Sequence, residues 1–426
     1  MPLPLLSSLR RVSFPVSSFA PNFMSATVPS PTTSLAMRRP FLIALAISLG
    51  AAVSLGMSRF SYALLLPTMR DDLGWTYLLA GAMNTGNAFG YFLGALTSPL
   101  LMRRFGARKM LLVGSLMTTL FMLLSGFVID TGFLMTQRIL SGIASAFIFI
   151  AGGVMAARLG ALHPRHAGFL IGIYYGGTGF GIVLSALLVP ATLAAAGSAA
   201  VAHGWQWAWI ALALTCLVAT LAMVVPVRQI PDPALPSGSH QRFQIRHFAF
   251  GLAAYFMFGA GYIGYMTFVV ALLKEQGMSA LMITLFYTSL GLAVIASARI
   301  WARMLDHFKG GQSLAILNAL LALATVLPAL TANPVLVFIS GLLFGGIFLS
   351  IVASTTALVR HNLPQPSWSA GIAGFTTVFA FGQIVGPSVV GWIADGPGGL
   401  ARGLLFSAAM LFIAALLALR QKALPA

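Results

Sequence analysis

The sequence predicts an all-α polytopic membrane protein with twelve transmembrane helices arranged as two six-helix halves. Of its 426 residues, 59% are hydrophobic and only 7% are charged, and the mean hydropathy is +0.94. Soluble domains carry about 25% charged residues because their surfaces face water. Apolar segments also recur along the chain, and the sequence pattern of the first six segments is repeated in the next six. A soluble globule is therefore excluded, and most of the surface must face lipid.

Each predicted span is an apolar segment of roughly 20 residues or more, the length that a helix needs to cross a bilayer core of about 30 Å. Twelve segments meet this requirement: 41–66, 76–101, 110–129, 133–157, 167–191, 206–227, 247–272, 279–302, 313–331, 335–359, 369–394 and 400–420. The connections between them are mostly short. They leave no room for a folded soluble domain.

The distribution of Lys and Arg predicts the orientation, because loops rich in these residues stay in the cytoplasm. Nineteen of the 24 basic residues fall on one side of the predicted spans, and only Arg70, Lys274 and Arg402 fall on the other. We therefore expect a multi-pass protein of the inner (cytoplasmic) membrane with both termini in the cytoplasm. The net charge of +17 reflects this asymmetry and does not indicate a nucleic-acid partner.

The chain divides around a polar central segment. Residues 1–40 are predicted to be a disordered cytoplasmic tail, 41–227 the first half, 228–246 a cytoplasmic linker, 247–420 the second half, and 421–426 a short cytoplasmic tail. Prolines interrupt residues 1–40, so they do not match a secretory signal. Two alternatives for this segment are a transit peptide and an extension upstream of a true start at Met24 or Met37.

The two halves share a repeat with an offset of 203 residues. It pairs Gly56 with Gly259, Tyr62 with Tyr265, Asp72 with Glu275, Gly74 with Gly277, and Phe105 with Phe308. Because the repeat returns after six spans, both halves have the same orientation. Parallel halves of this kind are one of the recognised plans of secondary transporters.

Several motifs in order along the chain resemble those of the major facilitator superfamily. After the second span, Gly94 precedes the segment Arg103-Arg104-Phe105-Gly106-Ala107-Arg108-Lys109, which is similar to the signature loop between helices 2 and 3. Arg103 stands where that signature has an acid, whereas the second copy has Asp306 and Lys309. The resemblance implies gating or conformational roles for residues at these motifs: Gly94, Arg104, Gly106, Arg108, Asp306, Lys309, Gly386 and Pro387.

Further motifs support and narrow the resemblance. Arg138-Ile139-Leu140-Ser141-Gly142 resembles an Arg-x-x-x-Gly motif of helix 4, and Gly382 to Pro387 resembles the antiporter-type motif. The segment from Gly56 to Tyr62 is similar to the first helix of the YbfB/YjiJ-type bacterial permeases. The resemblance implies the superfamily fold over residues 40–422 and a transport function.

Glycines spaced by four residues mark close helix contacts. Helix 2 carries Gly86, Gly90 and Gly94, and helix 11 carries Gly382 and Gly386. In the resembled fold these helices face each other across the halves, which makes the glycines candidate rocking surfaces. Packing within one half is the alternative.

Two arginines lie inside predicted spans. Arg59 is eight residues from Pro67, about 12 Å from the helix end, and Arg138 is six residues from Gly132, about 9 Å. A guanidinium at such depth costs at least ~2.5–3.5 kcal/mol and normally faces a cavity or a partner. Either arginine could instead bind backbone carbonyls in a structural role. The counterpart of Arg59 in the repeat is Tyr262, and this asymmetry favours contact with a solute.

Acidic residues are absent from the predicted spans, since all seven lie in loops or at helix ends. A cavity with two arginines and no acid favours an anionic or zwitterionic solute. Neutral polar side chains in the spans could add hydrogen bonds to the solute, and Tyr174 is one further donor of this kind. The candidate binding residues are Arg59, Tyr62, Asn84, Asn87, Arg138, Tyr262, Tyr265 and Gln383.

The predicted function is secondary active transport of a small organic anion or zwitterion by alternating access. Drug or metabolite efflux by the same fold is the alternative. No nucleophile motif or metal-binding helix occurs and Cys216 is the single cysteine, so neither an enzyme nor a cofactor is expected. The expected partners are the solute and the lipid bilayer, for a monomeric protein. The coupling partner, a proton or a counter-solute, stays open.

Overall fold

The computed structural model describes residues 39–231, 244–364 and 367–424, and this part of the chain is helical with no strands. The predicted N-terminal tail and most of the predicted linker lie outside the described residues. The first half contains α2 (Pro40–Ala51), η1 (Ala52–Phe60), α3 (Tyr62–Leu73), α4 (Tyr77–Phe105), α5 (Ala107–Ser125), α6 (Thr131–Leu162), η2 (Pro164–His166), α7 (Ala167–Ser198) and α8 (Trp205–Arg228). The second half contains η3 (Ile245–Phe248), α9 (Ala249–Glu275), α10 (Ala280–Ile300), α11 (Ala302–His307), α12 (Gln312–Leu330), α13 (Pro334–Asn362), α14 (Trp368–Ala394) and α15 (Gly399–Leu419).

The predicted spans correspond to these helices, with the first span made of α2, η1 and α3 in succession. Eleven segments of the described chain are long and apolar enough to cross a membrane. The remaining long helix, α4, has 29 residues, but Asn84, Thr85, Asn87 and several glycines lower its hydropathy. Because α4 packs against both α6 and α14, it is shielded from lipid on two sides. The predicted all-α membrane fold is confirmed.

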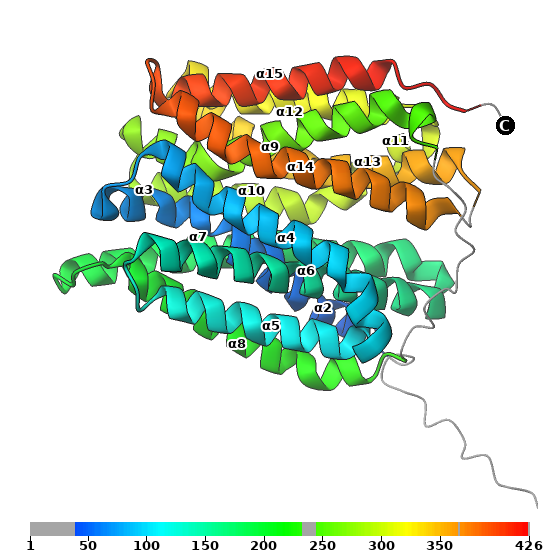
Figure 1. The fold of residues 1–426 in the computed structure, drawn as a ribbon, viewed down its shortest axis with the longest axis horizontal. Coiled ribbons are helices and arrows are strands. Elements are labelled where there is room, and N and C mark those ends of the chain that lie inside the picture. The colour runs from blue at the N-terminus through cyan, green and yellow to red at the C-terminus, as the bar shows by residue number, and fades with distance from the viewer. Residues whose placement is uncertain (1–38, 232–243, 365–366, 425–426) are drawn as a thin grey trace, which may run out of the picture.

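The helices form two bundles that lie side by side, with their axes roughly parallel (Figure 1). Three pairs of helices join the halves: α4 with α14, α7 with α10, and α3 with α9. In Figure 1, α5 and α8 lie at one edge of the molecule, and α12 and α15 lie at the opposite edge. Residues of η1, α4, α9 and α14 that face the boundary between the halves therefore lie in the interior.

The residues that cap the helix ends recur at the 203-residue offset. Three pairs of capping residues show it: Gly74 and Gly277, Thr76 and Ser279, and Asp130 and Asn333. The two glycines follow α3 and α9 with φ of 65° and 79°, a left-handed conformation that glycine adopts without strain. The other four side chains accept a backbone N–H of the first turn, as N-caps do. The capping residues at the helix ends therefore follow the internal repeat.

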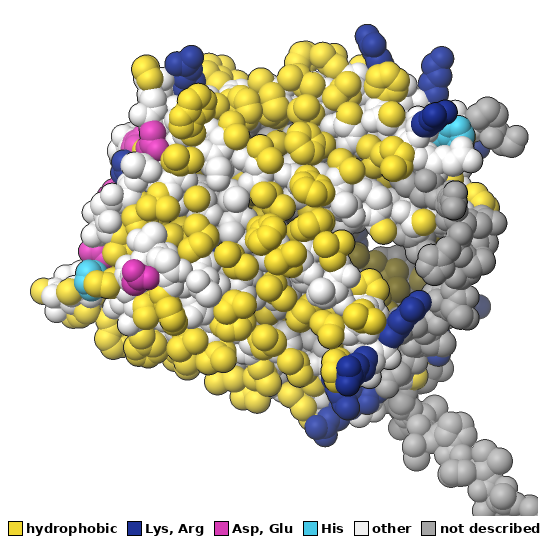
Figure 2. Space-filling model, in the orientation of Figure 1, with side chains coloured by type: hydrophobic (Ala, Val, Ile, Leu, Met, Phe, Trp, Pro, Cys, Tyr) yellow, Lys and Arg dark blue, Asp and Glu magenta, His cyan; other side chains and the backbone are white. Residues whose placement is uncertain are grey.

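Charged side chains gather at the two ends of the helices. Most Lys and Arg lie at one end, called the basic end below, and Asp and Glu gather at the other, called the acidic end (Figure 2). The basic end includes Arg104, Arg303 and Arg360, whereas Asp71, Glu275 and Asp395 lie at the acidic end. Between them, Figure 2 shows a largely hydrophobic surface, as expected for a protein surrounded by lipid.

Candidate functional site

The first span contains a change of helix type at its centre. η1, between α2 and α3, is a nine-residue π-helix that includes Arg59. π-helical turns are rare and occur frequently at functional sites. Gly56 lets η1 approach α7 closely, because a Cβ at this position would lie 2.6 Å from the Cα of Gly181. Arg59 is therefore carried by an irregular segment that is pressed against a neighbouring helix.

Side chains from surrounding helices bind the carbonyl groups of η1. Three such hydrogen bonds run from Ser145 to the carbonyl of Ser54 at 2.8 Å, from Arg138 to that of Ser58 at 2.9 Å, and from Tyr287 to that of Phe60 at 2.7 Å. Ser145 and Arg138 lie on α6 in the same half, whereas Tyr287 lies on α10 in the other half. Both halves thus fix the backbone on either side of Arg59.

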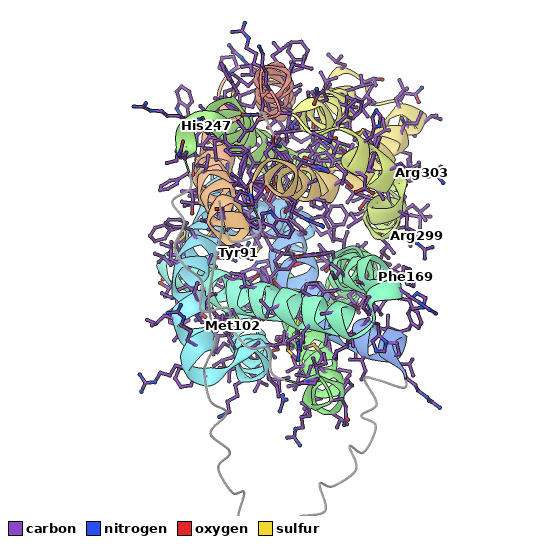
Figure 3. The ribbon with its side chains drawn as sticks, turned by 90° about the vertical axis from the view of Figure 1, so that its right-hand side faces the viewer. Tyr91, Met102, Phe169, His247, Arg299 and Arg303 are labelled. Carbon is purple, nitrogen blue, oxygen red and sulfur yellow. The ribbon has the colours of Figure 1, made fainter. Side chains whose placement is uncertain are left out.

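Arg59 is buried without a hydrogen-bond partner on one edge of its guanidinium. Its side chain is 3% exposed, and neither Nε nor Nη2 has a partner within the described part of the protein. Its Cζ lies 5.7 Å from the ring centroid of Tyr91. Figure 3, which views the molecule from the basic end, places Tyr91 between the two halves. Buried polar groups are normally paired, so this free edge makes Arg59 a candidate ligand-binding residue.

Arg138, in contrast, is engaged by protein groups. In addition to the carbonyl of Ser58, its Nη2 donates to Oδ1 of Asn84 at 3.1 Å. The guanidinium also lies 4.7 Å from the ring centroid of Tyr62 and 5.8 Å from that of Trp209. Cation–π contacts of this kind stabilise a desolvated guanidinium. Both terminal nitrogens of Arg138 are therefore bound by protein groups, whereas its Nε is buried without a partner among the described residues.

The polar residues of α4 connect Arg138 to the second half. Asn84 accepts from Arg138 and donates through Nδ2 to Oγ1 of Thr267 on α9 at 2.7 Å. Asn87 donates to the carbonyl of Arg138 at 3.1 Å, while its Oδ1 has no partner among the described residues. Tyr62 donates to the carbonyl of Ala80 at 2.8 Å and so does not point at a common ligand with Arg59.

The predicted site residues of the second half fall into two places. Tyr262 donates to Oε1 of Gln383 at 2.8 Å, a bond between α9 and α14 near the boundary of the halves. Tyr262 also stacks on Phe348 at 6.0 Å, and Phe348 packs edge-on against Phe60, the residue after Arg59, at 5.8 Å. Tyr265 instead bonds to Ser340 at 2.7 Å and stacks on Phe344, inside the second half. The structure thus brings Arg59, Tyr262 and Gln383 toward one region, and leaves Tyr265 outside it.

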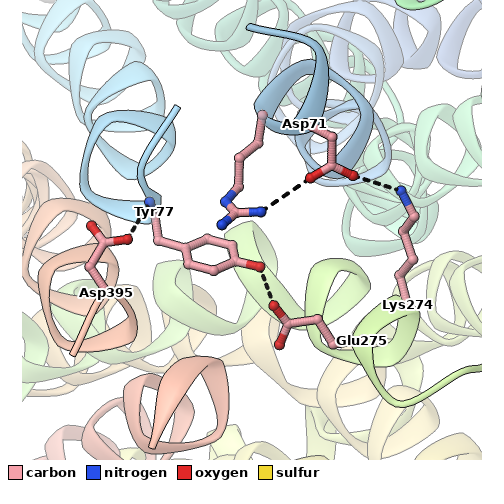
Figure 4. Close-up of polar contacts among 6 residues, drawn as sticks. Asp71, Tyr77, Lys274, Glu275 and Asp395 are labelled. Atoms are coloured by element: carbon pink, nitrogen blue, oxygen red, sulfur yellow. Dashed lines mark hydrogen bonds and ion pairs between the residues drawn. The ribbon is translucent and has the colours of Figure 1, made fainter. Parts of the chain in front are cut away.

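At the acidic end, polar contacts join the two halves (Figure 4). The carboxylate of Asp395 accepts the backbone N–H groups of Tyr77 and Leu78 at 2.7 and 2.8 Å, so a residue after α14 caps α4. The hydroxyl of Tyr77 donates to Glu275, and Nζ of Lys274 lies 3.2 Å from Oδ2 of Asp71. These bonds close the acidic end between the halves. Near the basic end, Figure 2 shows the surface hollowed between them.

The glycines of α4 and α14 mostly face their own half. A Cβ on Gly94 would lie 2.6 Å from the carbonyl oxygen of Ile143 on α6, and one on Gly386 would lie 2.5 Å from that of Ala260 on α9. These contacts correspond to packing within one half. Close contacts between α4 and α14 are at Gly81, where a Cβ would overlap the carbonyl of Pro387, and at Gly391, where a Cβ would overlap the carbonyl of Tyr77.

The other residues predicted for gating lie at the basic end. Gly106 has φ of 81° and separates α4 from α5, next to Arg104. Arg108 donates to the carbonyl of Ile230 at 3.0 Å and so ties the α4–α5 turn to the end of α8. In the second half, Asp306 lies in α11, and the carbonyl of Lys309 accepts from Asn362 at 2.7 Å.

Sequence reasoning missed several residues of this region. The π-helix had no recognisable signal, and Tyr91 and Tyr287 could not be told from packing residues without the tertiary contacts. The acidic-end contacts did carry a signal, because Asp71 and Lys274 are separated by 203 residues and occupy equivalent positions in the repeat. Because these two residues carry opposite charges at equivalent helix ends of the two halves, they predict a contact between the halves.

The fold, the parallel repeat and a buried site at the boundary of the halves together define a transporter of the major facilitator superfamily. Within it, residues 51–419 match the family described as "Uncharacterised MFS-type transporter YbfB", and the chain belongs to that family. The predicted resemblance is confirmed. Two proteins of Agrobacterium vitis, each named "Putative tartrate transporter", are 26% identical over 83% of this chain and 86% or 83% of their own length.

A shorter match and two solved structures complete the comparison. "Probable anion transporter 6, chloroplastic" of Arabidopsis thaliana is 31% identical over 33% of this chain and 27% of its own length. A mutant of the nucleoside transporter NupG has a TM-score of 0.68 at 13% identity, covering 88% of this chain and 99% of that chain. A bacterial homologue of the human lysosomal transporter Spinster, in an inward-facing and unoccupied conformation, has a TM-score of 0.67 at 14% identity and covers 89% and 96%. These structures show a shared fold.

Proposed function

We propose that this protein is a secondary active transporter that moves a small organic anion or zwitterion across the cytoplasmic membrane by alternating access. The observation that carries the proposal is the free edge of Arg59, where Nε and Nη2 are buried and unpartnered among the described residues. These two atoms form one side of the guanidinium fork. That side matches the two oxygens of a carboxylate, and charge-assisted pairs of this geometry are strong and directional.

The electrostatics of the spans favour an anion over a cation. Arg59 and Arg138 are the buried basic side chains of the described chain, and its buried residues include no Asp or Glu. A transported cation would meet this positive field with no carboxylate to balance it. The names of the relatives agree with this choice, since two are called putative tartrate transporters and one a probable anion transporter.

The contacts at the two ends of the helices support the proposed alternating access and orientation. The contacts of Asp395, Tyr77 and Lys274 close the acidic end, and we take the basic end to face the cytoplasm by the positive-inside rule. Transport then requires these contacts to break while the basic end closes. The orientation is tested by placing a cysteine at position 238 after Cys216→Ser. Labelling by an impermeant reagent from outside intact cells would contradict it.

The function is tested with a thermal-shift screen of the purified protein against carboxylates, amino acids, sugars and cationic drugs. We expect a carboxylate to stabilise the wild-type protein and to have no effect on Arg59→Gln. Stabilisation by a carboxylate that persists in Arg59→Gln would remove the support for this site. Strong proton-driven efflux of ethidium from cells would instead favour the alternative, an efflux permease.

A further inference from the structure

Asn87 of α4 carries a buried acceptor that no group of the described chain uses. The side chain is fully buried, its Nδ2 donates to the carbonyl of Arg138 at 3.1 Å, and its Oδ1 has no partner among the described residues. Because only the amide nitrogen can donate to a carbonyl, this bond determines which end of the amide is the free oxygen. Buried acceptors are normally satisfied, so Oδ1 is available to a ligand.

Asn87 and Arg59 border the same region of the interior, as contacts on two sides show. On one side, the backbone carbonyl of Arg138 accepts from Asn87. Nη1 of the same arginine donates to the carbonyl of Ser58, the residue before Arg59. On the other side, Tyr91 follows Asn87 by one turn on the same face of α4, and its ring centroid lies 5.7 Å from Cζ of Arg59. The two residues therefore lie around one region between η1, α4 and α6.

A single unpaired atom does not define a binding site, as Asn318 shows. This residue of α12 is also buried, its Nδ2 donates to the carbonyl of Leu314 at 2.8 Å, and its Oδ1 lacks a partner in the described part of the chain. However, α12 lies at the edge of the molecule, away from the boundary of the halves (Figure 1). Asn87 differs because its free acceptor shares a region with two free donors, Nε and Nη2 of Arg59. Together they match a ligand that has both acceptors and a donor.

Tyr91 connects this region to the basic end of the molecule. Its side chain is partly exposed, and Figure 3 shows it between the two halves when the protein is viewed from that end. Because the ring lies against the guanidinium of Arg59, a solute that enters from the basic end would pass Tyr91 to reach the free donors.

The ligand donor that fits Asn87 best is a neutral hydroxyl. A hydroxyl has one O–H to donate, which matches one free amide oxygen. An ammonium group has three N–H donors, and each needs an acceptor when the group is buried. The buried side chains of the described chain also include Arg59 and Arg138 but no Asp or Glu, so no carboxylate of the protein would balance a further positive charge. Asn87 and Arg59 together therefore fit a carboxylate that carries a hydroxyl.

We propose that the transported anion is a small hydroxycarboxylate, with its carboxylate on the Nε and Nη2 edge of Arg59 and its hydroxyl donating to Oδ1 of Asn87. This inference rests on the proposed function and names the chemical class of the solute. Two pairs of anions isolate the hydroxyl: lactate with propionate, and malate with succinate. The members of each pair carry the same charge and differ in a single hydroxyl.

The test measures binding of these four anions and of alanine to the purified full-length protein by calorimetry. In each pair that binds, we expect the hydroxylated anion to bind about 2- to 10-fold more tightly, which is the contribution of one neutral hydrogen bond. Alanine has an ammonium group where lactate has its hydroxyl, and it should bind more weakly than lactate. These comparisons use the wild-type protein and do not depend on the folding of a variant.

Replacing Asn87 then assigns the preference to its amide oxygen. Asn87→Leu has a similar size and should abolish the preference for the hydroxylated anions, while the affinity for propionate and succinate is kept. The carbonyl of Arg138 lies inside α6 and retains its helical hydrogen bond, so the variant should fold. Asn318→Leu makes the same change at the other buried asparagine with a free oxygen and should leave every affinity unchanged. Melting temperatures of all samples identify any variant that is misfolded.

The possible outcomes separate this inference from the proposed function. Equal binding within the pairs, or tighter binding of the anions without a hydroxyl, would overturn the hydroxycarboxylate. A preference that persists in folded Asn87→Leu would overturn the role of Asn87, and tighter binding of alanine than of lactate would replace the hydroxyl by an ammonium group. In these cases the proposed function stands if binding requires Arg59. Failure of all five compounds to bind would overturn both.

Discussion

Replacing Arg59 separates a solute-binding arginine from a structural one. Arg59→Lys keeps a positive charge but replaces the planar fork by a single ammonium group. Arg59→Gln removes the charge and leaves a neutral amide of smaller reach. Because Nε and Nη2 have no partner among the described residues, neither change breaks a hydrogen bond of the protein at these atoms. The loss should therefore appear in binding, and stability should be kept.

The magnitude follows from the number of bonds that the fork can make. A hydrogen bond to a charged group contributes about 1.5–3 kcal/mol, and the fork offers two. Arg59→Lys loses part of this pair, so affinity for a carboxylate should fall by about 1–3 kcal/mol, or roughly 5- to 150-fold. Arg59→Gln should lower affinity by more than about 100-fold, since both charge-assisted bonds are lost.

The assay is carboxylate binding and melting temperature on the same purified samples. The melting temperature of Arg59→Gln should stay equal or rise, because an unpaired buried charge has been removed. Arg303→Gln, which removes an exposed charge at the basic end, is the matched control and should bind normally. A structural arginine predicts the reverse pattern: poor expression or a lower melting temperature, with normal affinity in the protein that survives. That result would refute the reasoning.

Contacts elsewhere in the helices give three further predictions. Arg138→Met should destabilise the protein by about 2–4 kcal/mol, because it leaves the Ser58 carbonyl and Asn84 Oδ1 unpaired. The melting temperature should therefore fall, and an unchanged melting temperature would contradict this prediction. Gly56→Ala should reduce expression and stability through overlap with α7, whereas Gly346→Ala, with nothing within 4 Å of its Cβ, should be neutral. Asp395→Ala removes the cap on α4 at a cost of about 1 kcal/mol, which should open the acidic end more often. Ala271 is buried beside Tyr77 and Lys274, so alkylation of Ala271→Cys in a Cys216→Ser background should rise about 5-fold. An unchanged rate would argue against closure by this contact.

The fold could be predicted because its causes are local and repeated. Lipid requires long apolar helices, and the capping residues that end them recur at the 203-residue offset, as Gly74 and Gly277 show. The lower hydropathy of α4 has its cause in Asn84 and Asn87, which bind polar groups of the interior, and the sequence still predicts a span at 76–101.

The candidate site could be predicted only in part. Burial of Arg59 and Arg138 followed from their depth in the spans, but their different surroundings did not, because the partners of Arg138 come from η1 and α4. The π-helix depends on side chains from α6 and α10 that bind its carbonyls, and no local pattern encodes it. The stacking of Phe379 of α14 on Tyr255 and Phe258 of α9 also depends on a tertiary contact between these two helices.

Counterflow in proteoliposomes tests the central claim most directly. Vesicles with the purified protein are loaded with an unlabelled carboxylate that binds it, and the same carboxylate is added outside with a label. The account predicts transient, saturable accumulation of label in vesicles with the wild-type protein and none with Arg59→Gln, although both proteins reconstitute in the folded state. Equal counterflow by Arg59→Gln would contradict the role of Arg59, and flux that rises without saturation would contradict alternating access.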